Sequence, residues 1–153
     1  MAKKRQPQTQ ETYIVELENS ECDYSIGLNL MKNKLGAYSE YCHPKISGKI
    51  IRPDLKSIPT AKITLIANRH MDEELSERNT FRHEPVAVGH LETRSGELQG
   101  SMSIPFSAIG MIMQGIATGQ IRYVTMHGSK LRYRQTLITS IGFIKDYDPV
   151  MYE

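Results

Sequence analysis

The segment QIRYVTMHGSKLRYRQTLITSIGFI, residues 120–144, decides the fold prediction. Two runs rich in β-branched and aromatic residues flank Gly128-Ser129, and such runs are typical of strands. Glycine at the first position of a two-residue loop is typical of a type II′ hairpin turn. We therefore predict a long C-terminal β-hairpin, with strands over 120–127 and 130–144, in which Met126 faces Leu131 and Val124 faces Tyr133.

This hairpin has two predicted faces, because side chains alternate along a strand. The face that carries Leu131, Tyr133 and Leu137, together with Ile141 and Phe143, is the predicted core. The opposite face carries cations, an imidazole and an aromatic ring. Its residues are Tyr123, Thr125, His127, Lys130, Arg132 and Arg134.

The rest of the chain also favours strands. Apolar residues alternate with polar ones over 13–17 and 24–30, and 61–67 is a β-branched run typical of a central strand. Ser95-Gly96 predicts a turn between a strand at 86–91 and its partner at 97–104. The fold class predicted is mainly β, an antiparallel β-sandwich or an open barrel.

One helix is predicted over about 105–118, directly before the hairpin. Phe106, Ile109, Ile112, Met113 and Ile116 lie at helical spacing and form one apolar face. The residue types at its ends agree with this prediction, since proline suits the first turn of a helix and glycine the position just past its end.

Composition and charge are ordinary for a folded domain. The chain has 153 residues, of which 39% are hydrophobic, and a formal net charge of +2. We expect a flexible polar tail over 1–12 and a single β-rich domain over 13–153. The basic N-terminus lacks a following apolar run, and no segment approaches the roughly 18 apolar residues of a membrane span. We therefore expect a cytoplasmic protein with no membrane partner and with Cys22 and Cys42 reduced.

No motif of a cofactor, metal or nucleophile site occurs in the sequence. The polar loop over 68–84 holds His70 and His83, and His90 follows, but their spacing matches no common metal motif. Cys22 and Cys42 do not form a CxxC pair, and a disulfide would require that neighbouring strands align them. We therefore predict no cofactor and no catalytic residue, and retain the three histidines only as weak metal-ligand candidates.

The basic hairpin face gives the leading functional interpretation, a non-enzymatic module that binds a macromolecule. Protein is the favoured partner, bound through this face or a sheet edge, and self-association into a homo-oligomer is included. The first alternative is single-stranded nucleic acid, because cations neutralise phosphates and rings stack on bases. A second is an enzyme or metalloprotein that uses the 68–84 loop. An ordinary solvated strand face is the non-functional alternative.

Overall fold

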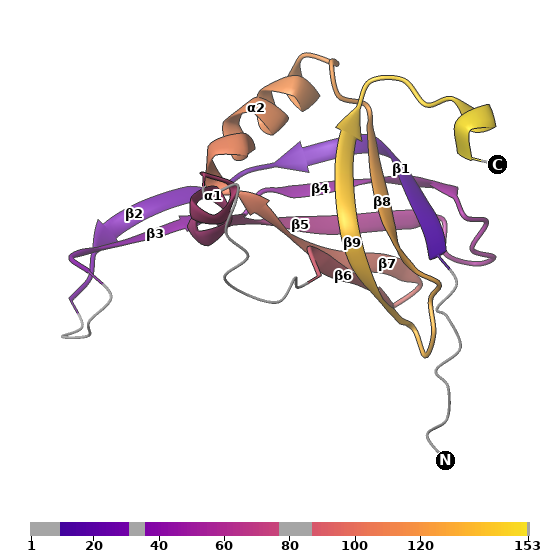
Figure 1. The fold of residues 1–153 in the computed structure, drawn as a ribbon, viewed down its shortest axis with the longest axis horizontal. Coiled ribbons are helices and arrows are strands. Elements are labelled where there is room, and N and C mark those ends of the chain that lie inside the picture. The colour runs from indigo at the N-terminus through magenta and orange to yellow at the C-terminus, as the bar shows by residue number, and fades with distance from the viewer. Residues whose placement is uncertain (1–9, 31–35, 77–86, 153) are drawn as a thin grey trace.

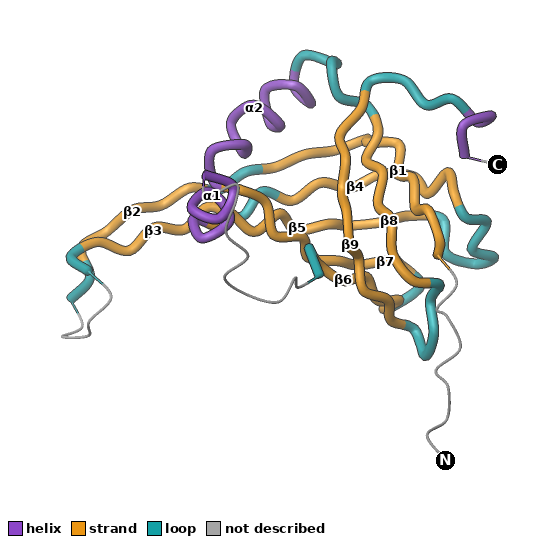
Figure 2. Tube along the Cα trace, in the orientation of Figure 1, coloured by secondary structure: helices purple, strands orange, loops and turns teal. Residues whose placement is uncertain are grey.

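The fold is a closed β-barrel with a small two-stranded sheet projecting from it (Figures 1 and 2). The computed structural model describes residues 10–152 except 31–35 and 77–86. Its strands are β1 (Gln10–Glu21), β2 (Tyr24–Leu28), β3 (Tyr38–Cys42), β4 (Lys45–Arg52), β5 (Thr60–Asn68), β6 (Gly89–Arg94), β7 (Glu97–Pro105), β8 (Tyr123–Ser129) and β9 (Gln135–Ile144). Its helices are α1 (Arg69–Ser76), α2 (Phe106–Ala117) and the short 3-10 helix η1 (Pro149–Tyr152).

The barrel closes because β1 pairs with β4 on one side and with β8 on the other. Around the barrel the order is β1-β4-β5-β7-β6-β9-β8. The mainly β prediction is confirmed, but the barrel is closed rather than open, and β5 and β7 are parallel. This mixed order arises because β6 starts at the end of the barrel where β5 finishes. A tight turn follows β6, and β7 then runs antiparallel to β6 and parallel to β5. Strand β7 therefore lies between β5 and β6 in the sheet.

The turn at Ser95-Gly96 is confirmed. Both residues have positive φ, 54° and 75°, and Arg94 pairs directly with Glu97. Two consecutive left-handed residues are the signature of a type I′ turn, which suits two-residue hairpins.

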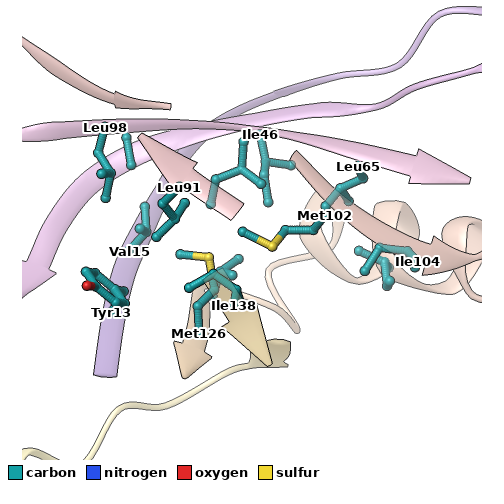
Figure 3. Close-up of a cluster of buried hydrophobic side chains, with 14 of the residues drawn as sticks. Tyr13, Val15, Ile46, Leu65, Leu91, Leu98, Met102, Ile104, Met126 and Ile138 are labelled. Carbon is teal, nitrogen blue, oxygen red and sulfur yellow. The ribbon is translucent and has the colours of Figure 1, made fainter. Parts of the chain in front are cut away.

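Inward-facing side chains from every barrel strand fill the interior (Figure 3). Tyr13 and Val15 from β1 are buried there, as their alternation predicted, and Leu17 packs partly against them. Full burial of each large aliphatic side chain contributes roughly 1.5–3 kcal/mol. The fully buried aliphatic residues include Ile46, Ile63, Leu65, Leu91, Leu98, Met102, Met126 and Ile138.

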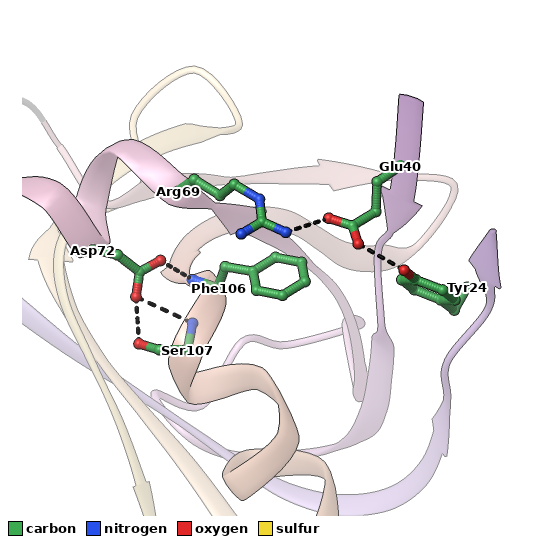
Figure 4. Close-up of polar contacts among 6 residues, drawn as sticks. All are labelled: Tyr24, Glu40, Arg69, Asp72, Phe106 and Ser107. Atoms are coloured by element: carbon green, nitrogen blue, oxygen red, sulfur yellow. Dashed lines mark hydrogen bonds and ion pairs between the residues drawn. The ribbon is translucent and has the colours of Figure 1, made fainter. Parts of the chain in front are cut away.

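Helix α2 lies where a helix was predicted and packs through the predicted face, with Ile109 and Ile112 buried against the barrel core. The N-terminus of α2 is capped by a residue of α1, which is distant in sequence, because the N-cap residue Pro105 makes no side-chain capping bond (Figure 4). The Asp72 carboxylate of α1 accepts the Phe106 N–H at 2.7 Å and the Ser107 N–H at 3.1 Å, and also the Ser107 hydroxyl. These bonds satisfy amide groups that have no partner within the helix.

The predicted turn and register of the last two strands are wrong. Strands β8 and β9 do pair antiparallel, but residues 130–134 connect them, and Met126 pairs with Ile141 rather than with Leu131. A register irregularity beyond His127 reverses the alternation of β9. As a result Thr136 and Ile138 are buried, whereas Leu137 remains 61% exposed and Tyr133 fully exposed.

Strand β1 begins at Gln10, inside the tail predicted over 1–12. Beyond Glu21 the chain leaves the barrel and forms the arm, which we define as β2 and β3. These two strands pair only with each other. The arm extends away from the barrel at the end opposite the β8–β9 connection (Figure 1).

Candidate interaction site

A hollow lined by charged, polar and apolar side chains lies on the outer surface of the barrel, bounded by β6, β9 and the β8–β9 connection. It measures about 430 Å³ and is lined by His90, Glu92, Ser129, Lys130, Arg132, Gln135, Thr136 and Leu137. A second hollow of about 260 Å³ shares His90 and Glu92 with the first. Its other lining residues are Lys45, Lys62, Thr64, Gln99, Gly100 and Ser101. Together we call the two hollows the basic groove.

The strand register explains how residues from five strands form this groove. Residues directly opposite each other on paired strands share a face of the sheet. One row therefore crosses the barrel wall as Lys45, Thr64, Ser101, His90 and Leu137. The adjacent row runs through Lys62, Gln99, Glu92 and Gln135. Since paired strands lie about 4.8 Å apart, a row across five strands is about 19 Å long.

Alternation turns these side chains outward, because their neighbours occupy the core. Leu91 is fully buried, so His90 and Glu92 on either side of it face solvent. Ala61 and Ile63 are buried in the same way on β5, which places Lys62 on the outer face.

The groove carries more positive than negative charge. Lys45, Lys62, Lys130 and Arg132 line it, and Glu92 is the one carboxylate among its lining residues. None of these four cations forms an ion pair within the part of the chain that the structure describes. Cations that lack an internal counter-ion attract an anionic partner, and a concave surface concentrates their field.

A hydrogen-bond network fixes the end of the groove beside the β8–β9 connection. The Ser129 carbonyl accepts hydrogen bonds from the Thr136 hydroxyl and, at 2.9 Å, from the Tyr13 hydroxyl. The Ser129 and Thr136 hydroxyls also bond to each other at 2.6 Å. Burial raises the pKa of Tyr13, so this phenol remains a donor at neutral pH.

The β8–β9 connection presents a cationic tip next to the groove. Tyr133 and Arg134 both have positive φ, 50° and 68°, which is uncommon for residues other than glycine. The turn is closed by reciprocal backbone bonds of 3.0 Å between Arg132 and Gln135. Backbone strain of this kind persists where the surrounding structure imposes it. This turn leaves the Tyr133 side chain fully exposed, between Arg132 and Arg134 in the sequence.

The structure brings only part of the predicted face together. Lys130 and Arg132 line the groove, and Arg134 is exposed on the adjacent tip. Thr125 is only 5% exposed, so its assignment to a binding face is wrong.

Two other members of the predicted face lie away from the groove. His127 Nδ1 lies 3.0 Å from the Thr12 hydroxyl, and the Tyr123 ring lies 6.0 Å from that of Tyr147. Neither residue lines the groove. On β9 their partners are Ile144 for Tyr123 and Ser140 for His127, and not residues of the 130–134 connection.

Sequence reasoning missed Lys45, Lys62 and Glu92. Each alternates with buried residues along its strand, which was a signal that it faces outward. No local signal brought β4, β5 and β6 to one groove, because their order around the barrel, with β7 between β5 and β6, depends on distant segments of the chain.

The two metal-ligand candidates that the structure describes, His70 and His90, lie on different elements, α1 and β6. His70 lies on α1, exposed and 3.5 Å from the Glu73 carboxylate, whereas His90 lies in the groove. His83 falls outside the described residues. Within residues 10–30, 36–76 and 87–152, no three His, Cys, Asp or Glu side chains gather into a group that could hold a metal ion.

An apolar hollow of about 510 Å³ lies between α2 and β9. Ile112 and Phe143 help to line it, and Met111 lies at its edge with 69% of its surface exposed. Met113 on the same helix is instead partly buried and packs against the core.

None of the described helices is long and apolar enough to span a membrane. No protein-family model matches the sequence, and neither curated proteins nor solved structures contain a significant match to it.

Proposed function

We propose that the protein is a non-enzymatic binding module that holds an extended acidic segment of a partner protein in the basic groove. The observation that supports this proposal is the set of four cations, unpaired within the described residues, that line two adjoining hollows with a single carboxylate between them. Ammonium and guanidinium groups bind carboxylates by charge-assisted hydrogen bonds, which are about twice as strong as neutral ones.

The shape of the groove suits an extended peptide. An extended chain advances about 3.3 Å per residue, so a groove of about 19 Å accommodates roughly six residues. Neutral donors and acceptors on its floor, such as Gln99, Ser101 and Gln135, can bond to a peptide backbone between the charged contacts. Glu92 is the one carboxylate in the lining and four cations outnumber it, so the groove keeps the net positive charge that an acidic peptide requires.

Single-stranded nucleic acid is the second candidate, and the fully exposed Tyr133 is the observation that favours it. A free aromatic ring between Arg132 and Arg134 offers a base-stacking surface beside cations. The ring lies on the tip rather than in the groove, which is the reason that we rank this candidate second.

Fluorescence anisotropy with two labelled probes, hexaglutamate and a six-nucleotide oligothymidylate, tests the proposal. We expect hexaglutamate to bind and its affinity to fall as salt rises, because exposed charges are screened over about 10 Å at 0.1 M salt. The double charge-reversal variant Lys62→Glu, Arg132→Glu should bind hexaglutamate at least about tenfold more weakly, which corresponds to about 1.4 kcal/mol.

The double variant Lys56→Glu, Lys145→Glu is the charge-matched control, since both residues are exposed cations outside the groove lining. It should leave the affinity for hexaglutamate nearly unchanged. Binding of the oligonucleotide alone, lost in Tyr133→Ala, would transfer the assignment to nucleic acid. Binding of neither probe at low salt would refute both candidates.

A further inference from the structure

The arm presents a sheet edge that no described segment covers. Strand β2 pairs with β3 and with no other strand, and each of its residues is exposed. An isolated two-stranded sheet is at best marginally stable in water, and a further strand or a packed helix stabilises it. Helix α1 contacts the arm through Arg69 and Glu40, and the outer edge of β2 can still accept a further strand.

The hydrogen-bond register shows which backbone groups face this edge. The Asn29 N–H donates to the Ala37 carbonyl at 2.8 Å, and the β2–β3 register continues this pairing to Gly27 with Ser39 and Ser25 with Tyr41. In an antiparallel pair, alternate residues bond to the partner strand and those between them point to the other side. The amide and carbonyl groups of Tyr24, Ile26 and Leu28 therefore point to the outer edge.

The same three residues place apolar side chains on one face of the arm. Ile26 is 60% exposed and Leu28 is 66% exposed. Natural sheets commonly protect edge strands with lysine, proline or a bulge. Strand β2, with the sequence YSIGL, contains no charged residue and no proline, and its register with β3 is regular.

We propose that β2 pairs antiparallel with β2 of a second copy of this chain, about a twofold axis at Ile26. In that register Ile26 faces its own copy and Tyr24 faces Leu28, so each outward amide and carbonyl of the three residues gains a partner. The result is a four-stranded sheet whose two central strands place Tyr24, Ile26 and Leu28 of both copies on one face, and the interface is isologous, as in most homodimers. This inference concerns the arm and does not depend on the basic groove.

Charge selects β2 over β3 as the shared edge. The equivalent twofold pairing of β3 about its central residue would bring Glu40 against its own copy, and like charges directly opposite are destabilising. Glu40 is also occupied within the chain, since its carboxylate accepts hydrogen bonds of 2.7 Å from both Arg69 and Tyr24 (Figure 4). These contacts hold the base of the arm against α1 and use only side-chain atoms of Tyr24.

Sedimentation equilibrium of the full chain tests this proposal. We expect a concentration-dependent dimer at about 100 μM, and Ile26→Lys should shift its dissociation constant by at least about a hundredfold. Ser39→Lys is the matched control, because it adds the same charge to the arm on β3 and on the opposite face. Circular dichroism and thermal unfolding should show that both variants retain the barrel.

A cross-linking experiment tests the register. In a Cys22→Ser, Cys42→Ser background, Ile26→Cys should form a covalent dimer when oxidised by oxidised glutathione, because opposed residues of paired strands lie within disulfide range. Ser25→Cys in the same background should not, since Ser25 faces Gly27 of the copy. A monomer at about 100 μM, equal loss of the dimer in Ile26→Lys and Ser39→Lys, or a dimer that Ile26→Cys does not cross-link would each overturn the proposal.

Discussion

The basic groove exists only if Leu137 of β9 faces outward and Ile138 faces the core. Replacing each of these two residues by alanine tests this orientation. Ile138 is fully buried, whereas Leu137 is 61% exposed and lines the groove. A Cβ placed on Gly128 would lie 2.9 Å from Ile138 Cδ1, so the Ile138 side chain packs directly over that glycine. Removing it would leave a void that neighbouring side chains cannot readily fill.

The two alanine variants should therefore differ clearly in stability. Ile138→Ala is expected to cost about 2–5 kcal/mol, since it combines lost burial with a cavity. Leu137 has only about two fifths of its side chain removed from water, so Leu137→Ala should cost about 0.8 kcal/mol, taking about 2 kcal/mol for full burial. For a chain of this length, Tm falls by roughly 2–4 °C per kcal/mol.

Urea unfolding followed by circular dichroism measures both changes from the midpoints at constant slope. The alternation first predicted from the sequence places Leu137 in the core and requires the reverse order of costs. A Leu137→Ala variant that is destabilised as much as Ile138→Ala would refute the observed sidedness, and the groove with it.

Three further predictions concern single contacts. The Ser107 hydroxyl and the α2 amides lower the pKa of Asp72 below its usual 3.8. Urea unfolding should therefore show that wild type is more stable than Asp72→Asn above that pH. This difference in the free energy of unfolding should disappear as the pH falls through the pKa of Asp72 in the folded protein. Gly89→Ala should destabilise by about 1–3 kcal/mol in thermal unfolding, because its Cβ would lie 2.1 Å from the Ser101 carbonyl oxygen. Cys22 and Cys42 interact at the base of the arm, and hydrogen peroxide should oxidise them to an intramolecular disulfide with release of water and a mass loss of about 2 Da.

Each of these predictions has an outcome that contradicts it. A constant difference between wild type and Asp72→Asn from pH 7 down to about 2 would remove the capping role. An unchanged Tm in Gly89→Ala would show that the strands separate easily at that point. Burial and the adjacent Cys22 raise the pKa of Cys42, so oxidation should be faster at about pH 9 than at pH 7, and no disulfide at either pH would show that the thiols do not meet.

Local patterns in the sequence predicted the elements well where one chain segment carried the information. The apolar spacing over α2 and the Ser95-Gly96 turn are examples, because both depend on residues within a few positions of each other. The alternation in β2 also predicted a strand correctly. Its apolar face is nevertheless exposed, since alternation reports which side chains share a face and not whether anything covers that face.

Features that depend on distant segments could not be predicted in this way. The irregularity in β9 reverses the faces of the strand within one residue, so a register extended from Gly128-Ser129 failed at Leu137. Asp72 caps a helix 34 residues further along the chain, and no local capping pattern indicates it. The candidate site required the barrel order as well, because β5, β7 and β6 separate Lys45 on β4 from the β9 side of the groove, and β7 and β6 separate Lys62 on β5 from it.

Titration of ¹⁵N-labelled protein with hexaglutamate, followed by two-dimensional NMR, shows directly whether the basic groove binds an acidic peptide. We expect the amide shifts to concentrate along the two rows of the groove, around Lys62, His90, Glu92 and Arg132, and to diminish with added salt. Shifts confined to the arm or to α2, or the absence of any shift at low salt, would contradict the assignment of the basic groove as the binding site.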